Sequence, residues 1–126
     1  MASTDLLKYF PAPQFIDHIK LSNDDLVTRN PFNGVLIRYT VSVEYSPDLI
    51  CIDSDSFQSF LLNFGSEGQT RAEEIAPALI NELFEFVDPK WMEVKVTEEY
   101  DVKKTVIVSK MREIDENGNF SPTKMK

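Results

Sequence analysis

The clearest pattern in the chain is a strict alternation of apolar and polar residues from position 35 to position 45. Apolar side chains occupy every second position, at Val35, Ile37, Tyr39, Val41, Val43 and Tyr45. Successive side chains of a β-strand point to opposite faces, so this period of two predicts a strand with one buried face. Phe15, Ile19 and Leu21 predict a weaker strand over 13–21. Residues 22–34, which contain Asn30-Pro31 and Asn33-Gly34, are predicted to form a loop.

A change of period after residue 53 indicates two helices. A short extended stretch is expected at 49–52, and the first helix follows it with an apolar stripe at Phe57, Phe60, Leu61 and Phe64. Asp53 or Ser54 is the expected N-cap of this helix. The second helix is predicted from Thr70, where Thr70 and Glu73 form a capping-box pattern, to Val87. Its apolar face comprises Ala76, Leu79, Ile80, Leu83 and Val87, and Pro77 is expected to bend it.

Two further strands are predicted over 91–99 and 104–110, and they complete an α+β chain. Helices grouped between strand pairs favour an antiparallel sheet with both helices on one face. We therefore expect one domain over 13–111, with an N-terminal lead over 1–12 and a polar C-terminal tail over 112–126.

Composition and charge exclude several classes of function. The net charge of −8 argues against nonspecific binding to nucleic acid or to an anionic membrane. No signal peptide and no apolar run long enough to span a bilayer is evident, which favours a cytoplasmic protein. The single cysteine, Cys51, and the single histidine, His18, exclude an intrachain disulfide and a metal site built on such residues. Neither a metal nor a cofactor is expected.

The order of strands and helices resembles the tunnelling fold, or T-fold, which is shared by GTP cyclohydrolase I, dihydroneopterin aldolase, urate oxidase and the 7-cyano-7-deazaguanine reductases of queuosine biosynthesis. Short motifs over residues 15–110 resemble those of the reductases, with one inserted residue placed between Gly65 and Thr70. The matching segments are Asn30-Pro31, Tyr45-Ser46-Pro47-Asp48, 51–58, Leu62-Asn63-Phe64, Ala72-Glu73, Asp88-Pro89 and Glu93-Val94. The resemblance implies a single T-fold domain whose copies assemble side by side into a barrel, as a homo-oligomer with sites between subunits.

The same resemblance implies that the reductase chemistry has been lost. The family's nucleophilic cysteine falls at Asn30, whose carboxamide cannot form the thioimide adduct. Its proton-donating aspartate falls at Ile37, which cannot transfer a proton. The histidine of a His-Glu pair falls at Ala72, and lysines that resemble cofactor-phosphate contacts fall at Asp55 and Gln58. An Arg-Gly-Gly segment expected near 101–104 is also absent.

Glu73 remains as the candidate ligand residue. Throughout the T-fold, a glutamate at this point binds the N–H groups of a purine- or pterin-like ring, an arrangement that is strong and shape-selective. Glu73 could instead only complete the capping box with Thr70, and without the inserted residue Ala72 would take the ligand position. Asp53 and Ser54 are further candidate ligand-binding residues, although capping of the first helix explains Asp53 and Asp55 better than metal binding does.

The remaining polar candidates have simpler explanations. Cys51 is expected to be a buried structural thiol. Glu98, Glu99 and Asp101 are expected to form a solvated acidic edge. His18 is expected to be exposed or at the margin of the core. Arg38 lies on the polar face of the long strand, where it could line a tunnel or an oligomer interface.

Three functions remain open on these grounds. The first is a catalytically diverged relative of the reductases that binds a purine-, deazapurine- or pterin-like ligand at subunit interfaces. The second is a non-enzymatic assembly or interaction protein that kept the fold and lost the site. The third, less favoured, is an active enzyme of the pathway, either the NADPH-dependent nitrile reductase or an amidine-forming relative; Asn30 counts heavily against both.

Overall fold

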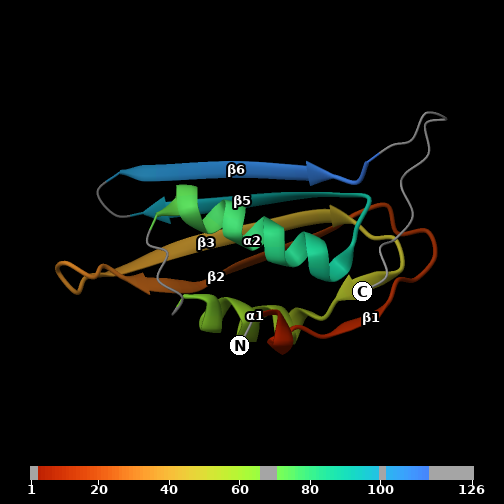
Figure 1. Cartoon of the computed structure of the whole chain (residues 1–126), viewed down its shortest axis with the longest axis horizontal. Coiled ribbons are helices and arrows are strands. Elements are labelled where there is room, and N and C mark those ends of the chain that lie inside the picture. Colours follow the sequence, from red (N-terminus) through yellow and green to blue (C-terminus); the bar gives the residue numbers. More distant parts are fainter. Residues whose placement is uncertain (1–2, 66–70, 100–101, 114–126) are drawn as a thin grey trace.

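A computed structural model of the chain describes residues 3–65, 71–99 and 102–113 (Figure 1). It contains two α-helices, one short 3-10 helix and six strands. The elements in chain order are η1 (Ser3–Leu6), β1 (Tyr9–Pro11), β2 (Ile19–Arg29), β3 (Leu36–Ser46), β4 (Ile50–Ile52), α1 (Ser54–Phe64), α2 (Ala72–Val87), β5 (Trp91–Glu99) and β6 (Lys103–Met111).

The main sheet is antiparallel and has the strand order β2-β3-β5-β6. The predicted alternation in β3 is confirmed, because Ile37, Tyr39, Val41, Val43 and Tyr45 are all buried. The strands predicted near 49–52, 91–99 and 104–110 are likewise present as β4, β5 and β6.

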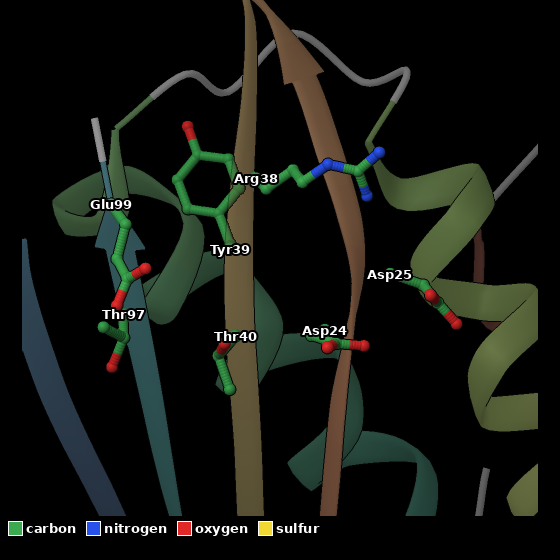
Figure 2. A pocket seen from close by; sticks show the side chains of 7 residues that line it. All are labelled: Asp24, Asp25, Arg38, Tyr39, Thr40, Thr97 and Glu99. Atoms are coloured by element: carbon green, nitrogen blue, oxygen red, sulfur yellow. The ribbon is translucent and has the colours of Figure 1, made fainter.

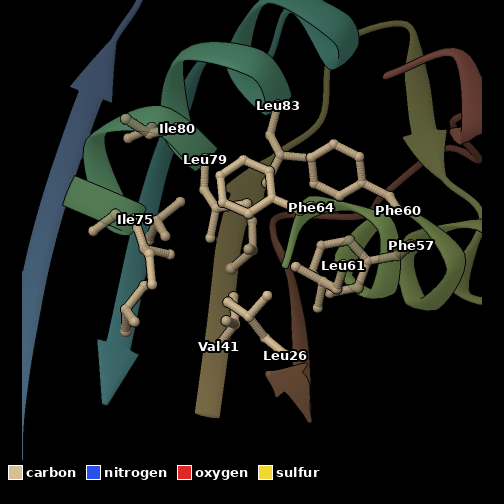
Figure 3. Packing of buried hydrophobic residues seen from close by; sticks show 14 of the residues in the cluster. Leu26, Val41, Phe57, Phe60, Leu61, Phe64, Ile75, Leu79, Ile80 and Leu83 are labelled. Atoms are coloured by element: carbon tan, nitrogen blue, oxygen red, sulfur yellow. The ribbon is translucent and has the colours of Figure 1, made fainter. Parts of the chain in front are cut away.

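Both helices cover one face of the main sheet, as the order of elements predicts (Figure 1). Helix α1 contacts β2, whereas α2 lies over β5 and β6. The apolar stripes of the two helices meet the buried face of the sheet in one core, where Phe60, Leu61, Leu79 and Leu83 are fully buried (Figure 3). Burial of these stripes is the main source of helix stability in such a chain.

The second strand differs from the prediction in both position and length. Residues 13–18 are not in a strand, and Phe15 is 99% exposed with a positive φ. Strand β2 instead continues to Arg29, through most of the predicted loop. The polar run Asn23-Asp24-Asp25 hides this strand in the sequence, because it forms a β-bulge at which two residues face one residue of β3. The Asn23 side chain accepts a hydrogen bond from the Asp25 backbone N–H within this bulge.

The turn predicted from Asn30-Pro31 and Asn33-Gly34 is confirmed as the link between β2 and β3. The Asn30 side-chain oxygen accepts from the Phe32 N–H, and the Asn33 side-chain oxygen accepts from the Val35 N–H. Gly34 adopts a positive φ of 72°, which a side chain would disfavour.

The two chain ends take a larger part in the fold than the lead and tail expected for them. Within the expected lead, β1 pairs with β4 in a two-stranded sheet, and Leu7 is buried in the core. Arg112, placed in the polar tail by sequence, is buried between Asp48 and Asp88. Arg112 Nη1 lies 2.8 Å from Asp48 Oδ2, and Nη2 contacts both the side chain and the backbone carbonyl of Asp88. The rest of the expected tail, 114–126, lies outside the described residues.

Candidate functional site

A pocket of about 320 Å³ lies where the β2–β3 turn approaches the start of α2 and the adjoining ends of β5 and β6. Its lining brings together three positions that the sequence associates with chemistry, Asn30, Ile37 and Glu73. The full lining is Asn30, Pro31, Phe32, Ile37, Arg71, Glu73, Glu98 and Lys104. The volume lies at the lower end of the range of about 300–1,000 Å³ typical of small-molecule sites.

One side of the pocket is apolar. It is formed by Pro31 and Phe32 from the β2–β3 turn and by Ile37 from β3. Phe32 is 96% exposed, whereas Ile37 is buried. The Asn30 side chain holds the turn through its bond to the Phe32 N–H. Asn30 thus supports the turn at the position where the resemblance places a nucleophile.

The other side is charged and centres on Lys104. Lys104 Nζ lies 2.9 Å from Glu73 Oε1 and 3.7 Å from Glu98 Oε1. The hydrogen bond from Lys104 lowers the pKa of the Glu73 carboxyl, and the same bond raises the pKa of Lys104. Both groups are therefore charged at neutral pH. The Glu73 side chain remains 57% exposed, so it is accessible to a ligand.

The start of α2 corrects two predictions. The N-cap is Arg71, which makes no side-chain capping hydrogen bond. Glu73 is therefore the second residue of the helix, whereas the carboxylate of a capping box belongs to the third. Thr70 lies outside the described residues. The buried Ala72 donates its backbone N–H to Glu98 Oε1 at 3.1 Å, so a carboxylate from β5 lies at this helix N-terminus in addition to Glu73 and Glu74 of the first turn. Glu98 is only 15% exposed and is not part of a solvated acidic edge. Asp101 lies outside the described residues.

The other predicted ligand residues do not lie at this pocket. Asp53 is the N-cap of α1, and its side chain accepts from the Ser56 backbone N–H at 3.0 Å. Neither Asp53 nor Ser54 is among the residues that line the pocket. Cys51 is buried, as predicted, and burial raises the pKa of its thiol. A raised pKa makes a thiol less reactive, which fits a structural role.

Asp55 and Gln58, where the resemblance places phosphate-contacting lysines, do not suit the phosphates of a nicotinamide cofactor. Asp55 adds a negative charge to the first turn of α1. The Gln58 amide is already engaged, because its Nε2 donates to Asp25 Oδ2 at 2.8 Å. A phosphate group would meet carboxylates at both positions instead of the cations that bind it.

A larger hollow of about 490 Å³ lies on the main sheet, along β2, β3 and β5 (Figure 2). It is lined by Asp24, Asp25, Arg38, Tyr39, Thr40, Thr97 and Glu99. Arg38 and Thr40 are exposed and alternate with the buried positions of β3. The lining mixes both charge signs and has no apolar wall, which distinguishes this hollow from the first pocket.

The structure also places the remaining polar candidates. The exposed His18 precedes β2, with Nε2 3.1 Å from Glu44 and its ring near that of Trp91. Within residues 3–65, 71–99 and 102–113, no group of three His, Cys, Asp or Glu side chains is arranged to hold a metal ion. None of the helices described is long and apolar enough to cross a bilayer.

Sequence reasoning missed Lys104, Arg71 and Phe32 as pocket residues. The signal for Lys104 was present in the alternation of β6, since Lys104 shares a face with Val106 and Val108, which pack towards the core. The alternation alone does not place Lys104 at the pocket. That step also requires the strand register, in which Lys104 pairs with Glu98 across β5 and β6. No sequence signal marks Phe32 beyond its place in a turn.

Two solved structures define the class of protein to which this fold belongs. The apo form of the archaeosine synthase QueF-Like matches with a TM-score of 0.68 and 21% identity, over 76% of this chain and 95% of that one. The FolB protein from Vibrio cholerae matches with a TM-score of 0.56 and 11% identity, over 84% of this chain and 97% of that one. The chain is a T-fold protein, as the order of its elements predicts.

The sequence gives the family within that class. Residues 39–115 match the family model described as QueF-like protein, and the chain belongs to this family. NADPH-dependent 7-cyano-7-deazaguanine reductases from Nitratidesulfovibrio vulgaris and Desulfovibrio desulfuricans are 30% and 32% identical to it. Each match covers 74% of this chain but only 57% and 56% of the respective relative, so the chain spans a little over half the length of these enzymes.

Proposed function

We propose that the chain is a catalytically diverged QueF-like protein that binds a purine-, deazapurine- or pterin-like ring in the pocket of about 320 Å³. One observation carries the proposal. The pocket is open and unites Glu73 with an apolar wall, while the positions of the family's nucleophile and proton donor, Asn30 and Ile37, line the same space without reactive groups.

The two sides of the pocket suit the two kinds of surface that a flat heterocycle offers. The faces of the ring would pack against Phe32 and Ile37, since such rings stack well on aromatic and aliphatic side chains. The polar edge of the ring would meet Glu73, which is charged and accessible. A carboxylate that accepts from two neighbouring N–H groups binds more strongly than a neutral acceptor.

A non-enzymatic assembly role is the second candidate, and the form of the main sheet favours it. Strands β2 and β6 are both edges of this sheet, and their outward backbone groups could pair with other copies. Assembly and ligand binding are compatible, because sites between subunits would need both. The distinguishing property is therefore whether the pocket binds a ring.

The test is binding of guanine, 7-deazaguanine and pterin by calorimetry, with wild type and Glu73→Gln. We expect at least one ring to bind to wild type. Glu73→Gln should weaken it by about tenfold or more, because a charged acceptor becomes a neutral amide. Glu74→Gln is the matched control, since Glu74 is exposed in the same helical turn but does not line the pocket.

Two results would count against the proposal. Absence of binding by all three rings would leave the assembly role as the function. Nitrile-dependent oxidation of NADPH by the wild-type chain would show that the activity of the curated relatives persists, and it would contradict the roles assigned to Asn30 and Ile37.

A further inference from the structure

Lys104 contacts both acidic groups of the pocket, Glu73 and Glu98. Binding of ring N–H groups by Glu73 does not by itself require these contacts. Its ammonium group lies 2.9 Å from Glu73 Oε1 and more loosely, 3.7 Å, from Glu98 Oε1. An ammonium group has three N–H donors. Glu73 engages one of them closely, and the side chain is 39% exposed, so donor capacity remains for a ligand in the pocket.

Lys104 lies beside one oxygen of the Glu73 carboxylate, Oε1. This position determines which atom on the edge of a bound ring would face Lys104. A ligand bound to Glu73 would use Oε2 for one N–H group and Oε1 for the next, since each oxygen has more than one acceptor site. The next atom along the ring edge would then lie beside Lys104 Nζ. Because Lys104 only donates, that atom must be a hydrogen-bond acceptor.

We propose that Lys104 is a specificity-determining residue that selects rings whose edge carries an amine, a ring N–H and a carbonyl oxygen in that order. This inference rests on the proposed function, because it assumes that Glu73 binds the ring. A 2-amino-oxo ring such as guanine satisfies the order donor, donor, acceptor. Adenine and 2,6-diaminopurine do not, because each presents an acceptor nitrogen next to its amine groups and no carbonyl oxygen.

The surrounding charges keep Lys104 available for this role. Glu98 Oε1 accepts from the Ala72 N–H at 3.1 Å, and its contact with the Lys104 ammonium group is longer, at 3.7 Å. Arg71 lines the pocket as a second cation, but it forms none of the ion pairs of this cluster. Lys104 lies opposite Glu98 in the pairing of β5 with β6, and this pairing fixes the backbone of Lys104 at the edge of the pocket.

The experiment compares guanine with 6-thioguanine, which keeps the amine and the ring N–H but replaces the carbonyl oxygen by a weaker acceptor, sulfur. Dissociation constants are measured by calorimetry for wild type, Lys104→Met and Lys103→Met. Lys103 is the matched control, because it is the neighbouring lysine, pairs with Glu99 and does not line the pocket.

Wild type and Lys103→Met should bind guanine about tenfold to a hundredfold more tightly than 6-thioguanine, as expected for a hydrogen bond to a charged donor. Lys104→Met should lose this preference, mainly through weaker binding of guanine. If Lys104 had only a structural role, Lys104→Met would weaken the binding of both ligands equally. An unchanged ratio of the two dissociation constants in Lys104→Met would overturn the inference while leaving the proposed function intact. Failure of wild type to bind guanine would overturn the inference, and it would overturn the proposed function as well if 7-deazaguanine and pterin also fail to bind. A thermal unfolding curve for each variant establishes that it is folded.

Discussion

At the scale of residues, Asn30 and Ile37 carry the proposed loss of reductase chemistry. Asn30 and Ile37 line the same pocket as Glu73, so the three positions at which the resemblance places a nucleophile, a proton donor and a ring-binding carboxylate lie together. Asn30 contributes a hydrogen bond to the turn, and Ile37 contributes apolar surface. Under the proposed function, these positions remain grouped but carry no reactive atoms.

Introducing a thiol and a carboxyl group at these two positions should give the pocket covalent chemistry. In Asn30→Cys/Ile37→Asp, the introduced thiolate would add to the nitrile carbon of 7-cyano-7-deazaguanine, and the introduced carboxyl group would protonate the nitrile nitrogen to give a thioimide. We expect intact-protein mass spectrometry to show an increase equal to the mass of the nitrile compound. Asn33→Cys/Ile37→Asp is the control, because Asn33 lies in the same turn but does not line the pocket. Equal labelling of both variants would refute the grouping of these positions.

A second prediction at the scale of residues concerns Tyr45 at high pH. Burial raises the pKa of Tyr45 to about 12, and its hydroxyl oxygen accepts from the Ile52 N–H. The unfolded chain ionises near pH 10, so between about pH 10 and 12 the unfolded state binds fewer protons than the folded state. The free energy of unfolding should therefore fall as the pH rises through this window.

Urea unfolding at a series of pH values measures this fall. The slope from this one group is at most about 1.4 kcal/mol per pH unit. Tyr45→Phe should be less stable at neutral pH, because the Ile52 N–H loses its acceptor, but should show a shallower alkaline fall. Tyr9→Phe, at a residue that is 62% exposed, should keep the wild-type slope. An identical slope in Tyr45→Phe would mean that Tyr45 is not the cause.

At the scale of elements, the start of α2 depends on a neighbouring strand. Arg71 offers no side-chain cap, and Glu98 from β5 accepts from the Ala72 N–H instead. The carboxylate also complements the positive end of the helix dipole. This arrangement ties the helix N-terminus, and with it Glu73, to the edge of the sheet.

Glu98→Gln should therefore destabilise the fold by about 1 kcal/mol, which is typical for the loss of a good N-terminal cap. The urea midpoint is the measurement. Glu99→Gln serves as the control, because Glu99 is exposed and pairs with Lys103 across the strand ends. Equal midpoints for the two variants would show that Glu98 does not stabilise the helix start.

The elements also show how far sequence reasoning reaches. Strict alternation located β3, and the i, i+3, i+4 stripes located both helices, because each pattern reports the periodic burial that stabilises the element. Strand β2 was misplaced, because the Asn23–Asp25 bulge breaks the alternation and Phe15, though aromatic, is exposed. The fold resemblance located Glu73, whereas Lys104 and Glu98 required the pairing of β5 with β6.

At the scale of the whole molecule, Arg112 connects three distant parts of the chain. Its side chain is 7% exposed and contacts Asp48 after β3 and Asp88 after α2. Removing one partner of such a buried cluster leaves the remaining charges uncompensated. Arg112 therefore belongs to the folded domain and fixes the end of β6.

Arg112→Met should destabilise the chain by about 2–4 kcal/mol, with the cost arising from the two carboxylates that it leaves behind. Chemical unfolding measures the loss. Glu113→Gln, at the next residue and exposed, should change stability by less than about 0.5 kcal/mol. A loss below about 1 kcal/mol in Arg112→Met would mean that solvent already screens the cluster.

Assembly is the other prediction at this scale. Among the described residues, β2 and β6 are the edge strands of the main sheet, and they lead us to expect a homo-oligomer, whose native mass spectrum should show a multiple of 14.5 kDa. Thr105→Pro, which places a proline within edge strand β6, should shift the population towards monomer, because proline lacks the N–H that pairs strands. A monomer at micromolar concentration in wild type would refute assembly through these edges.

The position of Arg112 has a consequence for the order of events during synthesis. Its two carboxylate partners lie 64 and 24 residues earlier in the chain, so both leave the ribosome before it does. Until then, Asp48 and Asp88 can be brought together only as like charges. We therefore expect a nascent chain that ends before residue 112 to remain incompletely closed, and native stability to be reached only when Arg112 has emerged.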